Sequence, residues 1–542
     1  METTKGALCF ALLFLPCLLL NAEEQNFNLH LETLNRSSFP AGFVFGAASS
    51  SYQSEGAATV DGRGASIWDV FTHEDPAKIK DHSTGDVADE VYFMYKEDIL
   101  LMKSVGLDAF RFSISWPRLF PDGKISSGVN SKGVKFYDNL IDDLLSNGLQ
   151  PYVTLFHWDL PQALDKEYGG FLSPKIVDDY LDYVDYCFKT FGDRVKHWLT
   201  FNEPYQFSVL GYGYGVNAPG RCSSYIGNCR FGDSATEPYT VGHHLMLSHA
   251  AAVKLYRDKY KAYQKGQIGV TLSSRWFVPF SENEACLKAA QRALDFRLGW
   301  FLHPITYGDY PQTMRSLVGE RLPKFTKKEA EILKKSYDFL GLNYYTSNYV
   351  ADAVFFPNLT QNLSVTTDSR VSTSVMKNGN LIGLPTPLSW LYVCPEGLRA
   401  LVLYIKDNYD NPTICITENG VAEANNQTLS IEESLQDWLR ILYHSSHLSY
   451  LHQAIKEGAN VKGYFIWSFL DDFEWALGYT ARFGITFVDY ENGLRRYPKR
   501  SAIWFRKFLQ GKNEVISRPW ANNKELSFLF HGHERGRVSS SI

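Results

Sequence analysis

Two apolar segments of this chain end abruptly in polar residues, and each of them presents a glutamate. The first reads "VKHWLTFNEP" and places Glu203 directly after a β-prone run. The second reads "NPTICITENG" and places Glu418 at the end of another such run. Most glutamates on a soluble protein are solvated surface groups, but these two terminate segments that look buried. The shared ending predicts that Glu203 and Glu418 act as a pair.

The elements that must position this pair follow a repeating βα pattern. Segments with apolar residues at helical spacing, such as 89–106, 132–148, 174–192 and 396–409, separate short runs rich in β-branched and aromatic residues. This alternation predicts an α/β fold, a single (β/α)8 TIM barrel with long βα loops. A doubly wound open sheet is the alternative, but no Gly-rich dinucleotide turn follows a strand. The eight expected strands are Phe43–Ser49, Ala109–Ser115, Pro151–His157, His197–Glu203, Gln267–Ser274, Asp338–Tyr345, Thr413–Asn419 and Gly463–Asp471.

In such a barrel the functional residues collect at the C-terminal ends of the strands. The fourth and seventh strands lie on opposite sides, so Glu203 and Glu418 can face each other across the mouth. Two facing carboxyl groups suit the cleavage of a glycosidic bond. One protonates the leaving oxygen, and the other attacks the anomeric carbon or activates water. A separation of roughly 5–5.5 Å indicates retention of configuration, and roughly 6.5–9.5 Å indicates inversion.

The same motifs resemble a known family. "TFNEP" (Thr200–Pro204) and "ITENG" (Ile416–Gly420) resemble the paired signatures of glycoside hydrolase family 1, and the chain is similar to the plant β-glucosidases of that family. Other segments resemble the family in the same order, among them "DAFRFSISWPRLFP", "VTLFHWDLPQAL" and "WSFLDDFEWALGYTARFG". The resemblance predicts a catalytic domain over residues 39–518, followed by a tail at 519–542.

The resemblance implies a role for each matching position. Glu203 would be the general acid/base and Glu418 the nucleophile of a retaining double displacement. Arg111 and Tyr345 would contact Glu418 and keep it ionised. No metal and no organic cofactor is implied. The substrate-binding residues would be Gln53, His157, Asn202, Tyr345, Trp390, Trp467, Glu474, Trp475 and Phe483, with Trp467 under the sugar ring and Trp390 forming a wall of the aglycone cleft.

Plain structural explanations exist for several of these residues. His157 alone could be a buried structural histidine, and Trp467 and Trp475 could belong to the core. The adjacent His243 and His244 could suggest a metal site, but neighbours on a helix point in different directions, so we assign both to packing.

The leading functional hypothesis is a retaining β-glucosidase that removes terminal β-D-glucosyl residues from small plant glycosides. One alternative is a transglucosidase that uses the same site with an acceptor other than water. Another is a non-catalytic glycoside-binding relative, which the presence of both glutamates disfavours. A thioglucosidase is also disfavoured, because that branch typically has Gln at the position of Glu203. The aglycone and the preference for glucose over galactose or fucose stay open.

The N-terminus predicts a secretory route. An apolar run from Ala7 to Leu20 follows Lys5 and precedes an acidic pair, so residues 1–22 are expected to be a signal peptide. The run is short for a membrane span, and no other stretch approaches the necessary length, so no membrane anchor is expected. The apoplast, the vacuole and the ER lumen are all compatible destinations. The net charge of −5 shows no basic stripe, so nucleic acid is not an expected partner, and a homo-oligomer is possible.

Cysteine usage and sequons agree with that route. Cys222 and Cys229 lie close together in "RCSSYIGNC" and are expected to form a local disulfide, while the remaining mature cysteines read as buried thiols. A segment at 355–380 reads as a long insertion loop. Candidate N-glycosylation sites are Asn35, Asn358, Asn362 and Asn426.

Overall fold

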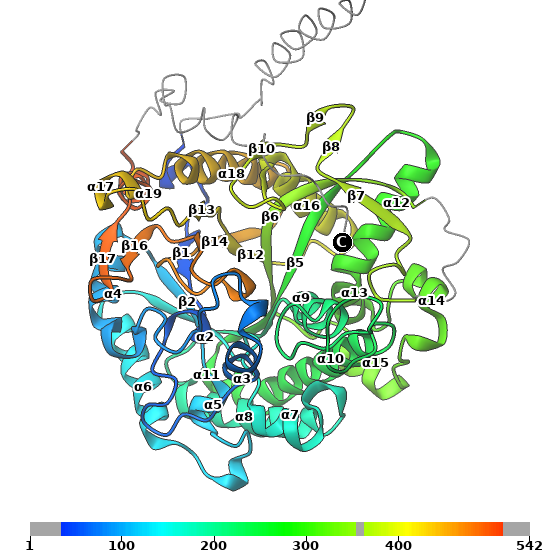
Figure 1. The fold of residues 1–542 in the computed structure, drawn as a ribbon, viewed down its shortest axis with the longest axis horizontal. Helices are drawn as coiled ribbons and strands as arrows, with labels where there is room; N and C mark the ends of the chain where they lie inside the picture. Colours follow the sequence, from blue (N-terminus) through cyan, green and yellow to red (C-terminus); the bar gives the residue numbers. More distant parts are fainter. Residues whose placement is uncertain (1–33, 354–362, 513–542) are drawn as a thin grey trace, which may run out of the picture.

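The computed structural model describes residues 34–353 and 363–512, and within them eight parallel strands form one closed ring (Figure 1). The last strand in the chain pairs with the first and with the seventh, and the seventh also pairs with the sixth, which closes the barrel. The predicted TIM barrel is therefore confirmed and the open sheet is excluded. The strands are β1 (Val44–Ala48), β2 (Ala109–Ser113), β3 (Gln150–Thr154), β4 (His197–Asn202), β5 (Gln267–Pro279), β6 (Phe339–Asp352), β12 (Ile414–Asn419) and β14 (Val461–Trp467).

Helices surround the barrel, with α4, α6, α8 and α18 at the periphery of Figure 1. The four helical patterns expected from the sequence correspond to α4, α6, α8 and α16. Local signals set their ends: Asn130 caps the start of α6, and Gly106 takes a left-handed conformation after α4. The longer helices are α3 (Ile67–Glu74), α4 (Val91–Val105), α6 (Ser131–Ser146), α8 (Ile176–Phe191), α10 (Glu237–Leu255), α12 (Glu284–Leu294), α13 (Trp300–Tyr307), α16 (Pro395–Asn408), α18 (Trp438–Lys456) and α19 (Arg500–Leu509).

Shorter elements fill the βα connections and carry the loops at the barrel mouth. The short helices are α2 (Ser51–Ser54), α5 (Trp116–Leu119), α7 (Gln162–Tyr168), α9 (Pro204–Val209), α11 (Lys261–Gln264), α14 (Gln312–Val318), α15 (Lys327–Leu333) and α17 (Ile431–Ser434). The short strands form hairpins or small ladders: β10 (Leu384–Pro385) with β11 (Tyr392–Val393), β13 (Glu423–Ala424) with β15 (Ala481–Arg482), and β16 (Thr486–Asp489) with β17 (Arg495–Pro498).

The described part of the segment at 355–380 contains short strands that its sequence did not suggest. β7 (Val371–Ser374) pairs antiparallel with the end of β6, and β8 (Met376–Lys377) forms a hairpin with β9 (Asn380–Leu381). The expectation of a loop throughout was therefore wrong for residues 371–381. Its polar composition hid strands that pair locally above the barrel. Residues 354–362 lie outside the described residues.

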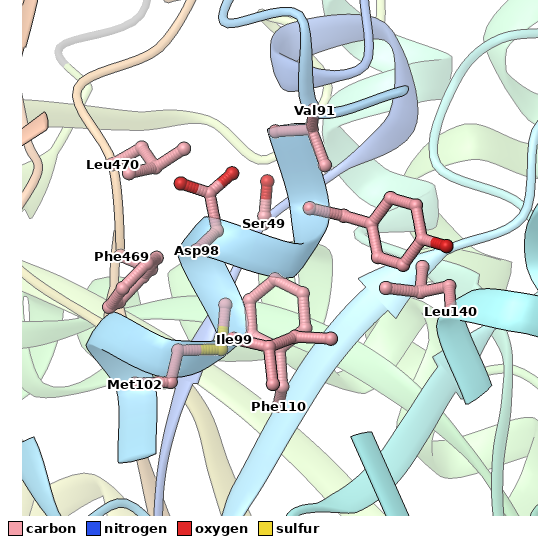
Figure 2. Close-up of a pocket in the computed structure, with 10 residues that line it drawn as sticks. Ser49, Val91, Asp98, Ile99, Met102, Phe110, Leu140, Phe469 and Leu470 are labelled. Atoms are coloured by element: carbon pink, nitrogen blue, oxygen red, sulfur yellow. The ribbon is translucent and has the colours of Figure 1, made fainter. Parts of the chain in front are cut away.

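Helix α4 shows how the outer layer packs on the barrel. Ile99 and Met102 lie against Phe110 of β2 and Phe469 of the segment after β14, around a cavity of about 10 Å³ (Figure 2). Asp98 stands beside this apolar cluster with its carboxylate between Leu470 and Ser49 in the view of Figure 2. The buried charge is matched by an arginine from another element: Arg496 of β17 donates to both Asp98 oxygens, at 2.8 and 3.2 Å.

Breaking this pair is expected to destabilise the fold. Both side chains are only 3% exposed, so Arg496→Met leaves a buried carboxylate without its cation and should cost about 3–5 kcal/mol at neutral pH. Burial raises the pKa of Asp98, and Arg496 opposes that shift. The cost should therefore be smallest below about pH 4, where Asp98 is protonated in both folded and unfolded chains, and should grow as the pH rises. Urea denaturation at pH 4 and pH 7 measures it.

The matched control removes the charge as well. Asp98→Asn in the Arg496→Met background should recover part of the lost stability at pH 7. An equal loss at both pH values, with no recovery in the double variant, would show that Arg496 acts through packing alone.

The cysteines and sequons fall into place as far as the structure extends. Cys222 and Cys229 form a disulfide with a Cα–Cα distance of 5.5 Å. Asn35 caps a short 3-10 helix (Arg36–Ser38), and Asn426 lies in an exposed turn. Within the described residues we find no helix with the length and apolarity of a membrane span. Asn358, Asn362, the expected signal peptide at 1–22, residues 513–518 of the expected domain and the tail at 519–542 lie outside the described residues.

Candidate active site

A cavity of about 660 Å³ opens at the C-terminal ends of the barrel strands. Two of the expected site residues do not line it: Arg111 and Gln53 are completely buried behind its wall. The other expected residues all do, although they come from distant parts of the sequence. They are His157, Asn202, Glu203, Tyr345, Trp390, Glu418, Trp467, Glu474, Trp475 and Phe483.

Glu418 is held by two hydrogen bonds, one at each carboxylate oxygen. Arg111 Nη1 donates to Oε1 at 2.6 Å, and Tyr345 Oη donates to Oε2 at 2.7 Å. The following Gly420 lies against β14, where a Cβ would stand 1.8 Å from the Trp467 carbonyl oxygen. Only glycine allows this approach, which sets the end of β12 close to β14. Glu418 is therefore an oriented carboxylate paired with a buried cation.

Glu203 has different surroundings. It follows β4 and precedes α9, and its φ of 46° lies in the left-handed region that non-glycine residues seldom adopt. Asn343 Nδ2 donates to its Oε1 at 2.9 Å. Burial, reinforced by the negative charge of Glu418, raises the pKa of Glu203 to about 8, against the opposing effects of Asn343 and nearby arginines. Glu203 can thus carry a proton at neutral pH and donate it.

A hydrogen-bonded chain connects the two glutamates. Asn202 Oδ1 accepts from Arg111 Nη2 at 2.7 Å and from Asn343 Nδ2 at 3.1 Å. The Asn202 amide nitrogen donates to His157 Nε2 at 3.0 Å. Burial, together with the charge of Arg111, lowers the pKa of His157 well below its usual range, so the imidazole is neutral. Its buried Nδ1 has no protein partner among the described residues, which leaves a donor for a ligand.

A third carboxyl group, that of Glu474, lines the same cavity. Burial, with the charge of Glu418, raises the pKa of Glu474 to about 8. Gln53 Nε2 donates to the Phe473 carbonyl at 3.0 Å and to Glu474 Oε2 at 3.4 Å, so Gln53 positions this part of the wall from behind. The aromatic lining includes Trp475, whose ring centroid is 4.5 Å from that of Trp158. Aromatic faces beside a carboxyl group suit a sugar ring, which has both an apolar face and hydroxyl edges.

Another part of the cavity lining is aromatic and cationic. Trp390 and Phe483 each approach Tyr345 edge-on with centroids 6.1 Å apart. Arg275 and Arg297 also line this cavity. No sequence pattern indicated Arg275 or Arg297, and Asn343 lies within an expected strand but was assigned no role.

The described residues contain no cluster of three or more His, Cys, Asp or Glu side chains arranged to hold a metal. His243 stacks on Phe325 at 4.5 Å and meets Tyr310 at 3.0 Å through its Nδ1, whereas His244 Nδ1 contacts the Phe171 carbonyl. The two histidines contact different neighbours, as their packing assignment requires.

Comparison with known sequences gives matches over most of the chain. The family model described as glycosyl hydrolase family 1 matches residues 35–514. Beta-glucosidase 17 of Arabidopsis thaliana is 57% identical over 486 residues, which cover 90% of this chain and 94% of that protein. Furcatin hydrolase of Viburnum furcatum is 54% identical over 487 residues, covering 90% and 89% respectively.

Solved structures show the same architecture. The rice β-glucosidase Os3BGlu6 superposes with a TM-score of 0.86 at 49% identity, covering 88% of this chain and 99% of that one. A mutant of it, solved in a covalent complex with glucose, gives the same values. A β-glucosidase from the fungus Humicola insolens, in complex with glucose, has a TM-score of 0.84 and 41% identity, with coverage of 88% and 98%.

Proposed function

The chain belongs to glycosyl hydrolase family 1 and hydrolyses O-glycosidic bonds of β-glucosides, and from this premise we propose that it does so with retention of configuration. In this proposal Glu418 is the nucleophile and Glu203 the general acid/base of a double displacement. The observation that carries it is the contrast between the two glutamates of one cavity. Glu418 forms an ion pair with Arg111, whereas the pKa of Glu203 is raised to about 8. Two carboxyl groups in unlike environments are the usual basis for separate acid and nucleophile roles.

The first half of the reaction forms the glycosyl-enzyme. Protonated Glu203 gives its proton to the glycosidic oxygen, and Glu418 attacks the anomeric carbon as the bond to the aglycone breaks. The covalent complex with glucose described for the Os3BGlu6 mutant is an intermediate of this kind in a relative. Glu418 loses its negative charge as the new bond forms, so its interactions with Arg111 and Tyr345 weaken.

The second half returns the enzyme to its starting state. Deprotonated Glu203 now takes a proton from a water molecule. The oxygen of that water attacks the anomeric carbon and displaces Glu418. Two inversions leave the β configuration in the product. Asn202, next to the acid/base and hydrogen-bonded to Arg111, is placed to bind the sugar 2-hydroxyl, a contact that strengthens in the transition state. His157, Glu474, Trp467 and Trp475 complete the sugar site.

The natural substrates in this proposal are small plant glycosides, cleaved after secretion. Relatives named furcatin hydrolase and furostanol glycoside 26-O-beta-glucosidase support substrates of that size. The apolar N-terminal run, the sequons and the disulfide support passage through the secretory pathway, to the apoplast, the vacuole or the ER lumen. A transglucosidase or a non-catalytic binding protein is not favoured by any contact in the cavity.

Product stereochemistry tests the proposal directly. Proton NMR during hydrolysis of p-nitrophenyl β-D-glucoside should show β-glucose first, followed by slow mutarotation to the α anomer. Adding methanol as acceptor should give methyl β-D-glucoside as the only transfer product, because the acceptor attacks the same face as water. α-Glucose as the first sugar would contradict retention, and no turnover of any aryl β-glucoside would contradict the hydrolase assignment for this chain.

A further inference from the structure

Two arginines lie in the catalytic cavity without a carboxylate partner. Arg275 belongs to β5, and Arg297 belongs to a π-helical turn (Asp295–Gly299) that continues α12. Both line the same cavity as Glu203 and Glu418. Across the described part of the chain, neither of these half-buried guanidinium groups forms an ion pair, whereas fully buried arginines do, such as Arg118 with Glu55 at 2.8 Å.

The contacts that these two arginines make among the described residues include aromatic rings and one amide but no ion pair. Arg275 Nη1 donates to Asn348 Oδ1 at 2.8 Å, and its guanidinium lies 5.6 Å from the Trp390 ring centroid. Arg297 lies 4.2 Å from the Tyr205 ring centroid, and its Nε is buried with no hydrogen-bond partner among the described residues. A guanidinium carries five N–H donors. Within the described residues, most donors of this pair therefore have no protein acceptor.

The electrostatic cost of this arrangement is visible in Arg275. Burial lowers its pKa to about 10, and the like charge of Arg297 contributes to that shift. Both arginines are half-buried, and a cation partly removed from water is seldom left without an anion, because the lost hydration is not recovered. Contacts with aromatic rings orient the two guanidinium groups but neutralise neither. An anionic ligand would supply both the missing charge and the missing acceptors.

The position of the pair assigns that anion to the aglycone. Tyr205 lies two residues after Glu203, and the charge of Arg297 acts on the Glu203 carboxyl. Glu203 must contact the glycosidic oxygen if it is the acid/base. In the proposed function, Trp467, Glu474 and their neighbours bind the sugar on one side of that oxygen. We therefore assign Arg275 and Arg297, with Trp390 beside Arg275, to the other side of Glu203, where the leaving aglycone would bind.

We propose that the aglycone site selects β-glucosides whose aglycone carries an anionic group, bound by Arg275 and Arg297. A carboxylate fits best, because its two oxygens match the planar donor fork of arginine. The proposal rests on the proposed function, since it places the anion relative to the acid/base. It narrows the proposed substrates from small glucosides in general to glucosides whose aglycone carries an acidic group.

Matched substrates test it. The 2-, 3- and 4-carboxyphenyl β-D-glucosides are compared with their methyl esters, which have the same shape without the charge, and with 4-sulfophenyl β-D-glucoside, which presents a tetrahedral anion. The measured quantity is the ratio of kcat/KM for acid over ester. For at least one isomer this ratio should fall about 10- to 100-fold in Arg275→Met or Arg297→Met, the usual weight of a charge-assisted hydrogen bond. Using the ratio cancels changes that affect both substrates.

Control variants separate charge from packing. Lys288→Met removes an exposed cation of α12, paired with Glu284 and 67% exposed, and should leave the ratio unchanged. Arg297→Lys keeps the charge and should retain more of the preference than Arg297→Met. Calorimetry provides a readout apart from turnover: 4-hydroxybenzoate should bind wild type more tightly than methyl 4-hydroxybenzoate does, and the difference should vanish in the double Met variant.

The possible outcomes separate a failure of the anionic-aglycone proposal from a failure of the proposed function. If esters are hydrolysed and no anionic isomer loses its ratio in any arginine variant, the anionic aglycone is wrong while the hydrolase stands. If neither acids nor esters are hydrolysed by wild type, the proposed function itself fails. A sulfonate preference with no carboxylate preference would keep the anion site and replace its ligand class.

Discussion

Replacing Glu418 by Gln is expected to lower kcat on p-nitrophenyl β-D-glucoside on the order of 10⁵-fold, the scale seen when a catalytic nucleophile is removed. The amide keeps the size of the side chain but cannot attack the anomeric carbon. The loss should be the same for activated and unactivated leaving groups, because no glycosyl-enzyme forms in either case. Steady-state kinetics with a sensitive fluorogenic glucoside, at high enzyme concentration, measures it.

The control for this variant is Glu457→Gln. Glu457 follows α18 on the outer surface, where its side chain is 41% exposed and pairs with Arg399, so its replacement should leave kcat within about twofold. Wild type treated with a 2-deoxy-2-fluoro-β-glucoside should gain one sugar mass on the peptide that contains Glu418. Labelling of another peptide, or a kcat for Glu418→Gln within tenfold of wild type, would show that Glu418 is not the nucleophile.

Replacing Glu203 by Gln is expected to produce a loss that depends on the leaving group. For an alkyl glucoside, whose departing oxygen needs a proton, kcat/KM should fall about 10²- to 10⁴-fold, the usual contribution of general acid catalysis. For 2,4-dinitrophenyl β-D-glucoside the first step should be nearly intact, since that phenol leaves as an anion. The glycosyl-enzyme should then accumulate, and azide should release it as β-glucosyl azide. Equal losses on both substrates would contradict the acid/base role.

The pH profile gives the same assignment by a separate route. An acid is active while protonated, so kcat/KM should be sustained below the pKa of Glu203, about 8, and should fall as the pH rises through it. In Glu203→Gln the residual activity on the alkyl glucoside should lack this alkaline limb. Glu474 also has its pKa raised to about 8. Survival of the limb in Glu203→Gln would therefore point to Glu474 as its source.

The barrel could be predicted from the sequence because its strands are buried on both faces. Continuous apolar runs, separated by helical spacing, leave few other folds open. The ends of β5 and β6 could not be predicted. The expected runs stop at Ser274 and Tyr345, whereas the strands continue to Pro279 and Asp352. Beyond the barrel those strands pair with each other and β6 pairs with β7. In the sequence, Arg275 interrupts the apolar run of β5, and polar residues follow Tyr345 in β6, so both runs end early in the sequence pattern.

The candidate site divides in the same way. Glu203 and Glu418 could be found because each interrupts an apolar strand with a charge, and the resemblance to a family supplied their partners. Arg297 could not be predicted as a site residue, because it lies in a helical pattern, where an arginine is normally expected on the solvent-exposed face. Gln53 illustrates a third case. It was expected to bind sugar, and it lies instead behind Glu474, so its direct contact with a ligand stays a prediction.

Strand β6 holds both glutamates at once. Asn343 reaches Glu203 and Tyr345 reaches Glu418, and residues two apart on a strand point to the same face. One strand thus positions both the acid and the nucleophile, and the two-residue repeat of its backbone sets the spacing of their two partners. A slip of β6 by one residue would withdraw both partners together. A shift of this whole strand is therefore expected to disturb both glutamates together, although Glu418 would keep its ion pair with Arg111 of β2.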